Sequence, residues 1–476
     1  MRRRPRVRAG VAAALFLALV QPAADAPAVG PSVALPLHVH VTDPAGDARL
    51  APSMVEWQRG RAPKETTITV DPARRYQTMT GFGASMTDSS ARNLSRLSAA
   101  THRDAMSSLF GHEGLGMNVV RVPLGASDFS GQGSYTYDDT PGNERDESLR
   151  HFRLAKDRQF VVPQLRAAQS AAGNRLTFIG SPWSAPAWMK SNGQLHGGVL
   201  TQRDETHFAK YLARAAQAYA AMGLPLDYLT IQNEPMHASD GYPTMEMSPS
   251  QASTVSRKVD QHLATKAPQT RILAYDHNWD VLAYPSAVLR TAGTRTTGTA
   301  WHCYGGTPDA QTLVHNAHPT SSTHLTECSG GKWQGSAAAA FDGTMYTLIQ
   351  APKHWAKTVS LWNIALDDEN GPTNGGCTDC RGIITVHRDG SWTKEIDYWA
   401  VAHLSRFVRP GATRIASSRI DGINSVAFTN PGNRHVLVAH NSTNEERTVT
   451  VQFGQRHASV TIPAHGAATM EWTGHA

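Results

Sequence analysis

The sequence predicts an α/β protein: a (β/α)8 TIM barrel with an all-β sandwich domain built from the C-terminal tail and from residues before the barrel. Its 476 residues exceed what a single core of ordinary size holds. Eight short strands recur at helix-length intervals after residue 76, which favours a closed parallel barrel. After Pro410-Gly411 apolar and polar residues alternate, as in short antiparallel strands. We expect sandwich strands at 27–75, the barrel at 76–406 and the rest of the sandwich at 407–476.

The first 26 residues have the pattern of a signal peptide. A basic start precedes an apolar run at 11–20 and the sequence Ala24-Asp25-Ala26. The apolar run is too short to span a bilayer, so we expect a secreted protein with no integral membrane segment after cleavage within about 24–30. The basic start consists of Arg2, Arg3, Arg4, Arg6 and Arg8.

Loss of this segment removes five Arg and one Asp, which lowers the formal charge from +6 to +2. The remaining chain has no long basic stripe, so the composition argues against a nucleic-acid partner. The 11 Trp are more suggestive, because indole faces stack on sugar rings, although Trp also fills cores. We expect a monomer whose partner is a polysaccharide or another β-glycoside.

Before the barrel, short alternating strands are predicted at 33–41, 54–58 and 65–70. The first contains His38-Val39-His40, which resembles a metal-binding His-x-His pair. The strand precedes the barrel pattern, and the later strand ends lack a matching ligand set. We therefore expect these histidines to be structural or exposed.

The barrel begins where the pattern changes to strand, turn and helix. Helical spacing is found at 89–110 and at 208–222, where Gly223 ends the second helix. Gly81-Phe82-Gly83 lacks the third glycine of a phosphate loop, so we expect its glycines to allow close packing. The barrel strands are predicted at 78–85, 118–124, 176–179, 228–232, 271–275, 298–304, 324–328 and 359–365. In the tail, strands are predicted at 423–429, 435–440, 448–453, 458–462 and 468–472.

Two strand ends carry a glutamate. Pro235 cannot continue the hydrogen-bond ladder of the strand at 228–232, so Asn233 and Glu234 lie at its carboxyl end. Glu327 ends the strand at 324–328. The carboxyl ends of barrel strands are where active sites lie. Glycoside hydrolysis needs two carboxylates, one as an acid and one on the other face of the sugar.

The four cysteines fall at Cys303, Cys328, Cys377 and Cys380. In an exported chain, Cys377-Thr378-Asp379-Cys380 predicts a small-loop disulfide. This segment lies in a Gly/Pro-rich loop, which does not suit thioredoxin-like chemistry. A second Cys/His pair at zinc-ligand spacing is missing.

Several collinear stretches between about 76 and 410 resemble glycoside hydrolase family 30, which includes glucosylceramidases and β-1,6-glucanases. They are Gly81-Phe82-Gly83-Ala84-Ser85-Met86-Thr87-Asp88, Arg121-Val122-Pro123, Ser127-Asp128-Phe129-Ser130, Tyr135-Thr136-Tyr137, Ser181-Pro182-Trp183-Ser184-Ala185-Pro186, Asn233-Glu234-Pro235, His302-Cys303-Tyr304, Glu327, Trp362-Asn363-Ile364-Ala365-Leu366 and Tyr398-Trp399. The resemblance implies a retaining β-glycosidase with Glu234 as acid/base and Glu327 as nucleophile. Retention predicts carboxyl groups roughly 5–5.5 Å apart.

The resemblance also implies a substrate-binding set. Asn233 would bind a sugar hydroxyl, often the 2-OH, and Asp128 more distal hydroxyls. Alternation places His302 and Tyr304 on one face, from which both would orient Glu327. Trp183 and Trp362 would flank the sugar ring. The remaining members of the set, which would line strand ends, are Asn363, Asp276 and His277.

The chain departs from the family pattern in two places. Cys303 replaces the Trp that glucosylceramidases carry between the inward His and Tyr, so Cys303 and Cys328 form either a disulfide or a buried thiol pair. The loop at 367–381 also differs, which leaves the leaving-group preference open. We expect cleavage of β-1,6-glucan or related β-glucosides, with glucosylceramide as the alternative.

Two other kinds of protein fit the barrel less well. A metal-dependent hydrolase would use Asp276, His277 and His302. A non-catalytic carbohydrate-binding protein would retain the site without the reaction, which the presence of both glutamates disfavours. We expect neither a metal nor another cofactor.

Overall fold

The computed structural model describes residues 36–173 and 175–474. The predicted signal peptide at 1–26 lies outside the described residues, as does the start of the first predicted strand. Within the described part of the chain, no helix combines the length and the apolar character that a membrane span requires.

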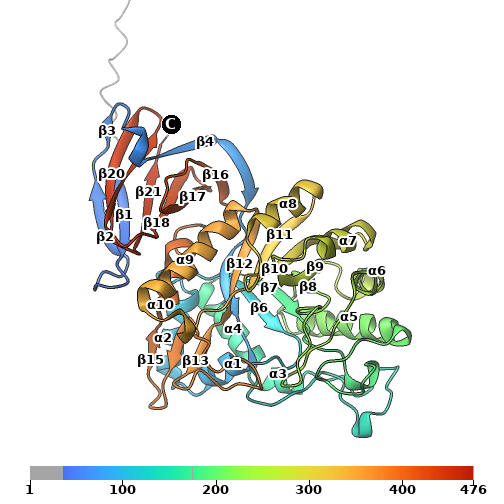
Figure 1. The fold of residues 1–476 in the computed structure, drawn as a ribbon. Helices are drawn as coiled ribbons and strands as arrows, with labels where there is room; N and C mark the ends of the chain where they lie inside the picture. The colour runs from blue at the N-terminus through green and yellow to red at the C-terminus, as the bar shows by residue number, and fades with distance from the viewer. Residues whose placement is uncertain (1–35, 174, 475–476) are drawn as a thin grey trace, which may run out of the picture. The chain divides into compact units, whose positions relative to one another are not determined.

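Eight parallel strands close into a barrel in chain order, with the last strand paired to the first (Figure 1). The predicted TIM barrel is therefore confirmed. Its strands are β5 (Gly81–Ser85), β6 (Val119–Pro123), β7 (Thr177–Ser181), β8 (Tyr228–Thr230), β9 (Arg271–Asn278), β10 (Thr296–His302), β11 (Ser322–Glu327) and β12 (Ala356–Asn363).

Helices connect these strands, and four of them begin at a Ser or Thr side chain that accepts a bond from a backbone N–H three residues later. Thr87, Ser98, Ser248 and Ser336 cap α1, α2, α6 and α9 in this way. The helices are α1 (Asp88–Ser95), α2 (Ala99–Phe110), α3 (Ala155–Gln159), α4 (Val161–Ala172), α5 (Glu205–Ala221), α6 (Pro249–Lys266), α7 (Ala283–Thr291), α8 (Asp309–Ala317), α9 (Ala337–Lys353) and α10 (Ile396–Ser405).

The barrel interior has an apolar layer beneath a polar one. Val119, Ile179, Leu273 and Ala300, from four strands, form a separate buried cluster. Because side chains alternate along a strand, residues two positions further on β6, β7 and β10 share this inner face. Those residues are Arg121, Ser181 and His302.

The glycines of β5 allow neighbouring strands to approach closely, as predicted. A Cβ on Gly81 would lie 1.8 Å from Asn118 Oδ1, and one on Gly83 would lie 1.7 Å from the carbonyl oxygen of Val119. The Asn118 amide binds the backbone of β5, accepting from Phe82 N and donating to Thr80 O.

Strands from both ends of the chain form one ten-stranded sheet, in the order β2-β1-β21-β18-β17-β16-β4-β19-β20-β3. In Figure 1 the blue strands from before the barrel lie in the same sheet as the red strands from the tail. Its members are β1 (Leu37–Thr42), β2 (Ala51–Val55), β3 (Gln58–Arg59), β4 (Thr67–Thr78), β16 (Thr413–Ser417), β17 (Ile423–Asn430), β18 (Arg434–Asn441), β19 (Arg447–Phe453), β20 (Arg456–Ile462) and β21 (Ala467–Thr473).

The structure corrects the predicted strands in three places. Thr78 ends β4 in the sheet, so the first barrel strand begins at Gly81 and not at residue 78. Strand β16 was not predicted. A further sheet of three short strands, β13 (Ala365–Asp367), β14 (Ile384–Val386) and β15 (Trp392–Lys394), was missed because three residues are too few to show a period.

Polar side chains join helices α9 and α10 to the sheet. Asp342 of α9 accepts bonds from His440 Nε2 at 2.7 Å and from His465 Nδ1 at 2.6 Å. His403 of α10 is buried between Thr42 and Thr469, with both ring nitrogens 2.8 Å from their hydroxyls. His40 of the predicted His-x-His pair contacts the ring of Phe407, in keeping with a structural role.

Candidate active site

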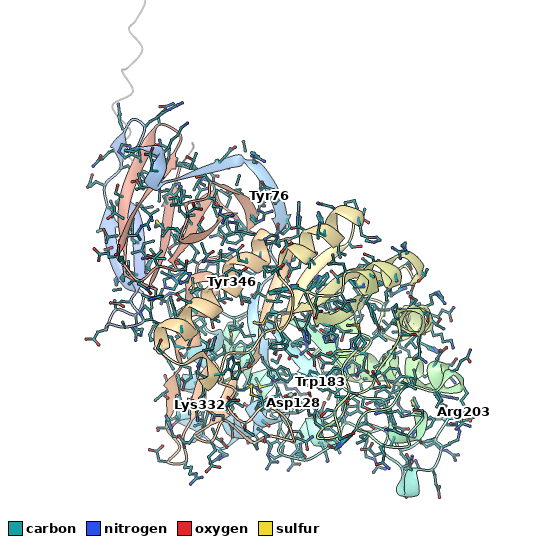
Figure 2. The ribbon with its side chains drawn as sticks, viewed as in Figure 1. Tyr76, Asp128, Trp183, Arg203, Lys332 and Tyr346 are labelled. Atoms are coloured by element: carbon teal, nitrogen blue, oxygen red, sulfur yellow. A yellow bond between two sulfur atoms is a disulfide. The ribbon has the colours of Figure 1, made fainter. Side chains whose placement is uncertain are left out.

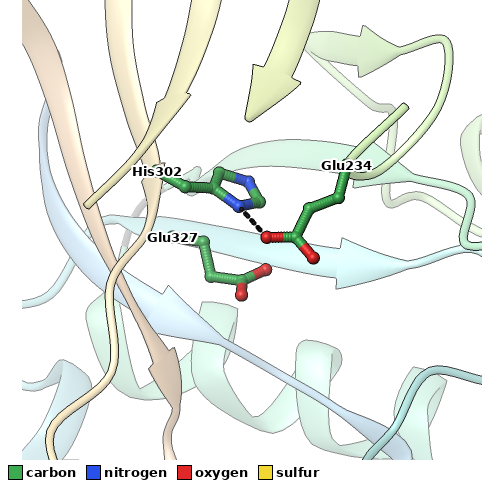
Figure 3. A group of neighbouring side chains, drawn as sticks. All are labelled: Glu234, His302 and Glu327. Atoms are coloured by element: carbon green, nitrogen blue, oxygen red, sulfur yellow. Dashed lines mark hydrogen bonds and ion pairs between the residues drawn. The ribbon is translucent and has the colours of Figure 1, made fainter. Parts of the chain in front are cut away.

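Two glutamates from distant strands face each other at the carboxyl end of the barrel. Glu234 follows β8 and Glu327 ends β11, and one carboxylate oxygen of each lies within 4.8 Å of the other. Figure 3 shows both carboxylates directed toward the same space, with His302 beside Glu234. The Glu234 side chain is 16% exposed and that of Glu327 is 7% exposed, so both are largely shielded from solvent.

Arg121 holds the polar layer together. It extends from the middle of β6, is fully buried, and donates to Glu327 Oε2 at 2.5 Å and to Asp276 Oδ2 at 2.9 Å. It also donates to Asn233 Oδ1 at 2.7 Å, which orients the amide next to Glu234. Burial lowers the pKa of Arg121, but Asp276 and Glu327 outweigh this and raise it. One guanidinium on β6 thus binds groups that lie on or just after β8, β9 and β11.

Asp276 is a buried support and not a substrate-binding residue as predicted. It is 0% exposed and accepts bonds from Ser181, Thr230 and Thr326 in addition to Arg121. Burial raises its pKa, but the charge of Arg121 and the bond from His302 outweigh this and hold the pKa of Asp276 well below its ordinary value. Its charge is therefore permanent in the neutral pH range.

His302 also differs from the prediction, because it hydrogen-bonds Glu234 and not Glu327. Its Nδ1 lies 3.2 Å from Glu234 Oε1 and its Nε2 lies 3.1 Å from Asp276 Oδ1. Burial lowers the pKa of His302, but Glu327, Asp276 and Glu234 outweigh it and raise the pKa to about 9. The ring is thus an imidazolium at neutral pH and donates to both carboxylates. Glu327 instead accepts a bond from Tyr304 Oη at 2.9 Å, as predicted.

The backbone around these groups is irregular. Glu234, Tyr275 and Asp276 have φ values of 44°, 85° and 63°, a region that costs non-glycine residues about 1–3 kcal/mol each. Strand pairing also shifts register at Asp276, Thr326 and Trp362, as in β-bulges. Bulges redirect side chains near active sites. They place Thr326 and Asp276 within hydrogen-bond reach of each other.

The two glutamates differ in their electrostatic surroundings. Burial raises the pKa of Glu327; His302 and Arg121 oppose this rise, and Glu234 adds to it. Burial acts in the same direction on Glu234, but the bond and charge of His302 lower its pKa. The surroundings thus shift the pKa values of the two carboxyl groups in opposite directions.

Two stacked tryptophans flank the carboxylates. Trp183 and Trp362 have ring centroids 5.2 Å apart and planes 18° apart, and the Arg121 guanidinium lies 4.8 Å from the Trp183 ring. Phe129 contacts Trp362 edge-on, and Tyr242 packs against the same cluster. Figure 2 labels Trp183 and, on the segment that follows β6, Asp128. An aromatic surface next to two carboxylates suits a sugar ring.

The other predicted residues lie around this centre. Burial, with the charges of Glu327 and Glu234, raises the pKa of Asp128 well above its ordinary value, while a hydrogen bond from Trp362 opposes the rise. His277 Nδ1 lies 3.8 Å from Glu234 Oε1 and has no hydrogen-bond partner among residues 36–173 and 175–474. Asn363 is buried at the end of β12, where its Oδ1 accepts from the Thr87 hydroxyl at 2.8 Å.

Glu234, His302 and Glu327 are also close enough to share a cation. The ring nitrogens of His302 are engaged by Glu234 and Asp276, and its raised pKa keeps it protonated. An imidazolium has no lone pair to offer a metal. The chemistry of this set therefore suits proton transfer and nucleophilic attack at carbon better than metal binding.

The structure decides both predictions about the cysteines. Cys377 and Cys380 form the expected disulfide, and Cys303 is bonded to Cys328, which selects the disulfide over the thiol pair. The Cys303–Cys328 disulfide joins the residue after His302 to the residue after Glu327.

Sequence reasoning missed the role of Arg121 and of the hydroxyls around Asp276. The signal for Arg121 was present, because an arginine within Val119-Val120-Arg121-Val122-Pro123 is buried by its neighbours and requires acceptors. Ser181, Thr230 and Thr326 gave no comparable signal, since hydroxyl residues are common in strands.

Two family models match almost the whole described chain. One, described as the glycosyl hydrolase family 30 TIM-barrel domain, matches residues 79–408. The other, the glycosyl hydrolase family 30 beta sandwich domain, matches residues 411–470.

Similar proteins act on more than one kind of glycoside. The chain is 36% identical to the endo-1,6-beta-D-glucanase neg1 of Aspergillus fumigatus over 422 residues, covering 82% of this chain and 84% of that protein. It is 28% identical to the lysosomal acid glucosylceramidase of Mus musculus, covering 83% and 81%. A solved structure of the endo-beta1,6-glucanase BT3312 superposes with a TM-score of 0.83 at 27% identity, covering 92% of this chain and 99% of that one.

Proposed function

The chain belongs to glycosyl hydrolase family 30, whose members are retaining glycosidases, and we propose that its substrate is a β-1,6-linked glucan. The identity to three endo-1,6-beta-glucanases, 33% to 36%, supports this substrate over glucosylceramide, because the identity to glucosylceramidases is 28% to 31%. The single observation that supports the reaction is the pair Glu234 and Glu327, with oxygens within 4.8 Å. Oxygens this close are compatible with the separation of roughly 5–5.5 Å between the carboxyl groups of a retaining pair.

Glu327 is proposed to be the nucleophile. It receives hydrogen bonds from Arg121 and Tyr304, which stabilise its carboxylate form and fix its orientation. In the first step Glu327 attacks the anomeric carbon, a glycosyl ester forms, and the bond to the leaving oxygen breaks.

Glu234 is proposed to be the acid/base residue. It gives its proton to the leaving oxygen in the first step. In the second step it takes a proton from the water that attacks the anomeric carbon and releases Glu327. The imidazolium of His302 holds one Glu234 oxygen at 3.2 Å, which leaves the other oxygen to exchange the proton.

The reaction needs Glu327 ionised and Glu234 protonated when the substrate is bound. Positive charge that develops at the anomeric carbon stabilises ionised Glu327, and a glycosidic oxygen beside Glu234 accepts from a protonated carboxyl group.

Incubation with a panel of substrates tests the proposal. Purified protein should release oligosaccharides from β-1,6-glucan faster than from xylan, and faster than it releases ceramide from glucosylceramide. Glu327→Ala should remove turnover of every substrate. Glu234→Ala should retain part of its activity on aryl glucosides with good leaving groups, which need little acid assistance. Preferential cleavage of glucosylceramide or xylan would contradict the substrate, and equal loss on all substrates would contradict the acid role of Glu234.

Export is a separate proposal that rests on the pattern of residues 1–26. It suits an enzyme whose substrate is a polysaccharide outside the cell. Expression of the full chain in a bacterial host, followed by N-terminal sequencing of protein from the medium, should give a start within about 24–30. Intact Met1 in a purely intracellular product would contradict export.

A further inference from the structure

The loop that follows β13 lies beside the candidate active site. We call residues 371–381 the strap. It lies within the loop at 367–381 where the sequence departs from the family pattern, so the resemblance assigns it no role. In the structure it contacts segments that follow three different barrel strands.

The first arm of the strap contacts the segment that carries Asp128. The backbone N–H of Asn374 donates to the carbonyl of Asp128 at 2.6 Å, and its amide donates to Ser127 O at 3.0 Å. Gly376 lies against the Asp128 side chain. A Cβ at Gly376 would lie 2.4 Å from Asp128 Cβ and 2.6 Å from its Oδ2, so glycine is needed for this approach.

The strap also contacts the segment that follows Glu234. A Cβ on Gly375 would lie 2.1 Å from the carbonyl oxygen of Gly241, so the two backbones are in close contact. Tyr242, the next residue, packs on the aromatic cluster of Trp183 and Trp362 together with Cys377 and Cys380.

The last arm contacts the segment that follows Glu327. Arg381 N donates to Gly330 O at 2.9 Å, and Lys332 N donates to Asp379 O at 2.8 Å. The Arg381 guanidinium binds Asp397 of α10 and Gln334, which anchors this end of the strap.

The Cys377–Cys380 disulfide connects the two arms directly. It fixes the distance between the part of the strap at Asp128 and the part beside Gly330. The catalytic carboxylates themselves are held by Arg121 and His302 from barrel strands and by Tyr304 just after β10. The barrel therefore positions the reacting groups, and the strap positions the aromatic and Asp128 side of the site.

We propose that the strap, closed by the Cys377–Cys380 disulfide and seated on Asp128 through Gly376, is a specificity-determining element that positions the sugar beside the cleaved bond. This inference rests on the proposed glycosidase function. It implies that damage to the strap weakens sugar binding while the chemical step persists. KM should then rise and kcat should change little.

Two independent variants test the strap. Cys377→Ser combined with Cys380→Ser releases the connection between its arms, and Gly376→Ala pushes the Asp128 side chain away. Each should raise KM for an aryl β-glucoside at least tenfold, with kcat within threefold of wild type. Each should also reduce the preference for glucoside over the xyloside that lacks the hydroxymethyl group. Thr378→Ala is the control, because this exposed side chain lies between the cysteines and its loss leaves the disulfide in place.

The outcomes separate the strap from the reaction. If KM stays within twofold in both test variants, or if kcat falls while KM does not change, the inference is wrong. Circular dichroism and thermal melting show whether each variant is folded, and Gly376→Ala retains the disulfide if the double variant does not fold. An inactive wild-type protein would contradict the proposed function instead.

Discussion

At the scale of single residues, Arg121 determines the geometry of the site. Its guanidinium binds Glu327, Asn233 and Asp276 with separate N–H groups. A lysine ammonium has the same charge but lacks the planar set of five donors that reaches these acceptors together. Arg121 thus couples the nucleophile to the residue beside the acid.

Arg121→Lys should therefore lower kcat/KM on the order of 100-fold, because a displacement of about 1 Å in a reacting group has an effect of this size. Steady-state kinetics with an aryl glucoside measures it, and thermal melting shows whether the variant is folded. Activity within a few fold of wild type would show that Arg121 supplies charge only.

The raised pKa of His302 makes stability depend on pH. A histidine whose pKa is about 9 in the folded state and 6.5 in the unfolded state stabilises the fold fully below pH 6.5. That contribution, about 3 kcal/mol, decreases as the pH rises and is lost above about 9. The difference in unfolding free energy between wild type and His302→Gln should shrink over this range. Denaturant titrations at several pH values measure it, and a constant difference would contradict a protonated His302.

At the scale of elements, the strand ends follow from the sequence but their irregularities do not. The sequence correctly places Glu234 after β8, which ends at Thr230, and alternation correctly places His302 on the inner face of β10. The bulges at Asp276, Thr326 and Trp362 arise from pairing between strands, which local patterns do not encode. This is why Asp276 was predicted to line the site, whereas it is buried beneath it.

The Cys303–Cys328 disulfide links the ends of β10 and β11, directly after His302 and Glu327. The two cysteines are 25 residues apart in the sequence, and a bond that closes a loop of this size stabilises the fold by restricting the unfolded chain. Its removal should therefore lower the unfolding free energy by about 3 kcal/mol. Cys303→Ser with Cys328→Ser, compared with wild type by denaturant unfolding, measures this. An unchanged unfolding free energy would show that the strands hold each other without the bond.

At the scale of the whole molecule, the sequence predicts the barrel and the sandwich but not the full extent of the sheet. Period-two alternation identifies β17 to β21. The predicted strand at 65–70 covers only the start of β4, which continues through Pro72 to Thr78, although proline is unusual inside a strand. The structure accommodates Pro72 where the register against β16 shifts, between the partners Asp71 and Arg75. Long-range pairing with the tail thus overrides the local signal.

Asp342 connects the barrel helix α9 to the sheet through His440 and His465. Asp342→Ala would leave these two side chains without their acceptor, at a cost of about 1–3 kcal/mol in unfolding free energy. The kcat for an aryl glucoside should stay within twofold of wild type, because Asp342 bonds the sheet and not the site. Thermal melting and kinetics at 25 °C test this together. A large loss of kcat in a folded variant would show that the sheet contributes to catalysis.

Covalent capture of the glycosyl-enzyme tests the double-displacement account most directly. A 2-deoxy-2-fluoro-β-glucoside with a good leaving group slows hydrolysis of the intermediate more than its formation. After incubation and proteolysis, mass spectrometry should find one glycosyl group on the peptide that contains Glu327, and on that residue. Attachment to another side chain, or inhibition with no covalent product, would contradict Glu327 as the nucleophile.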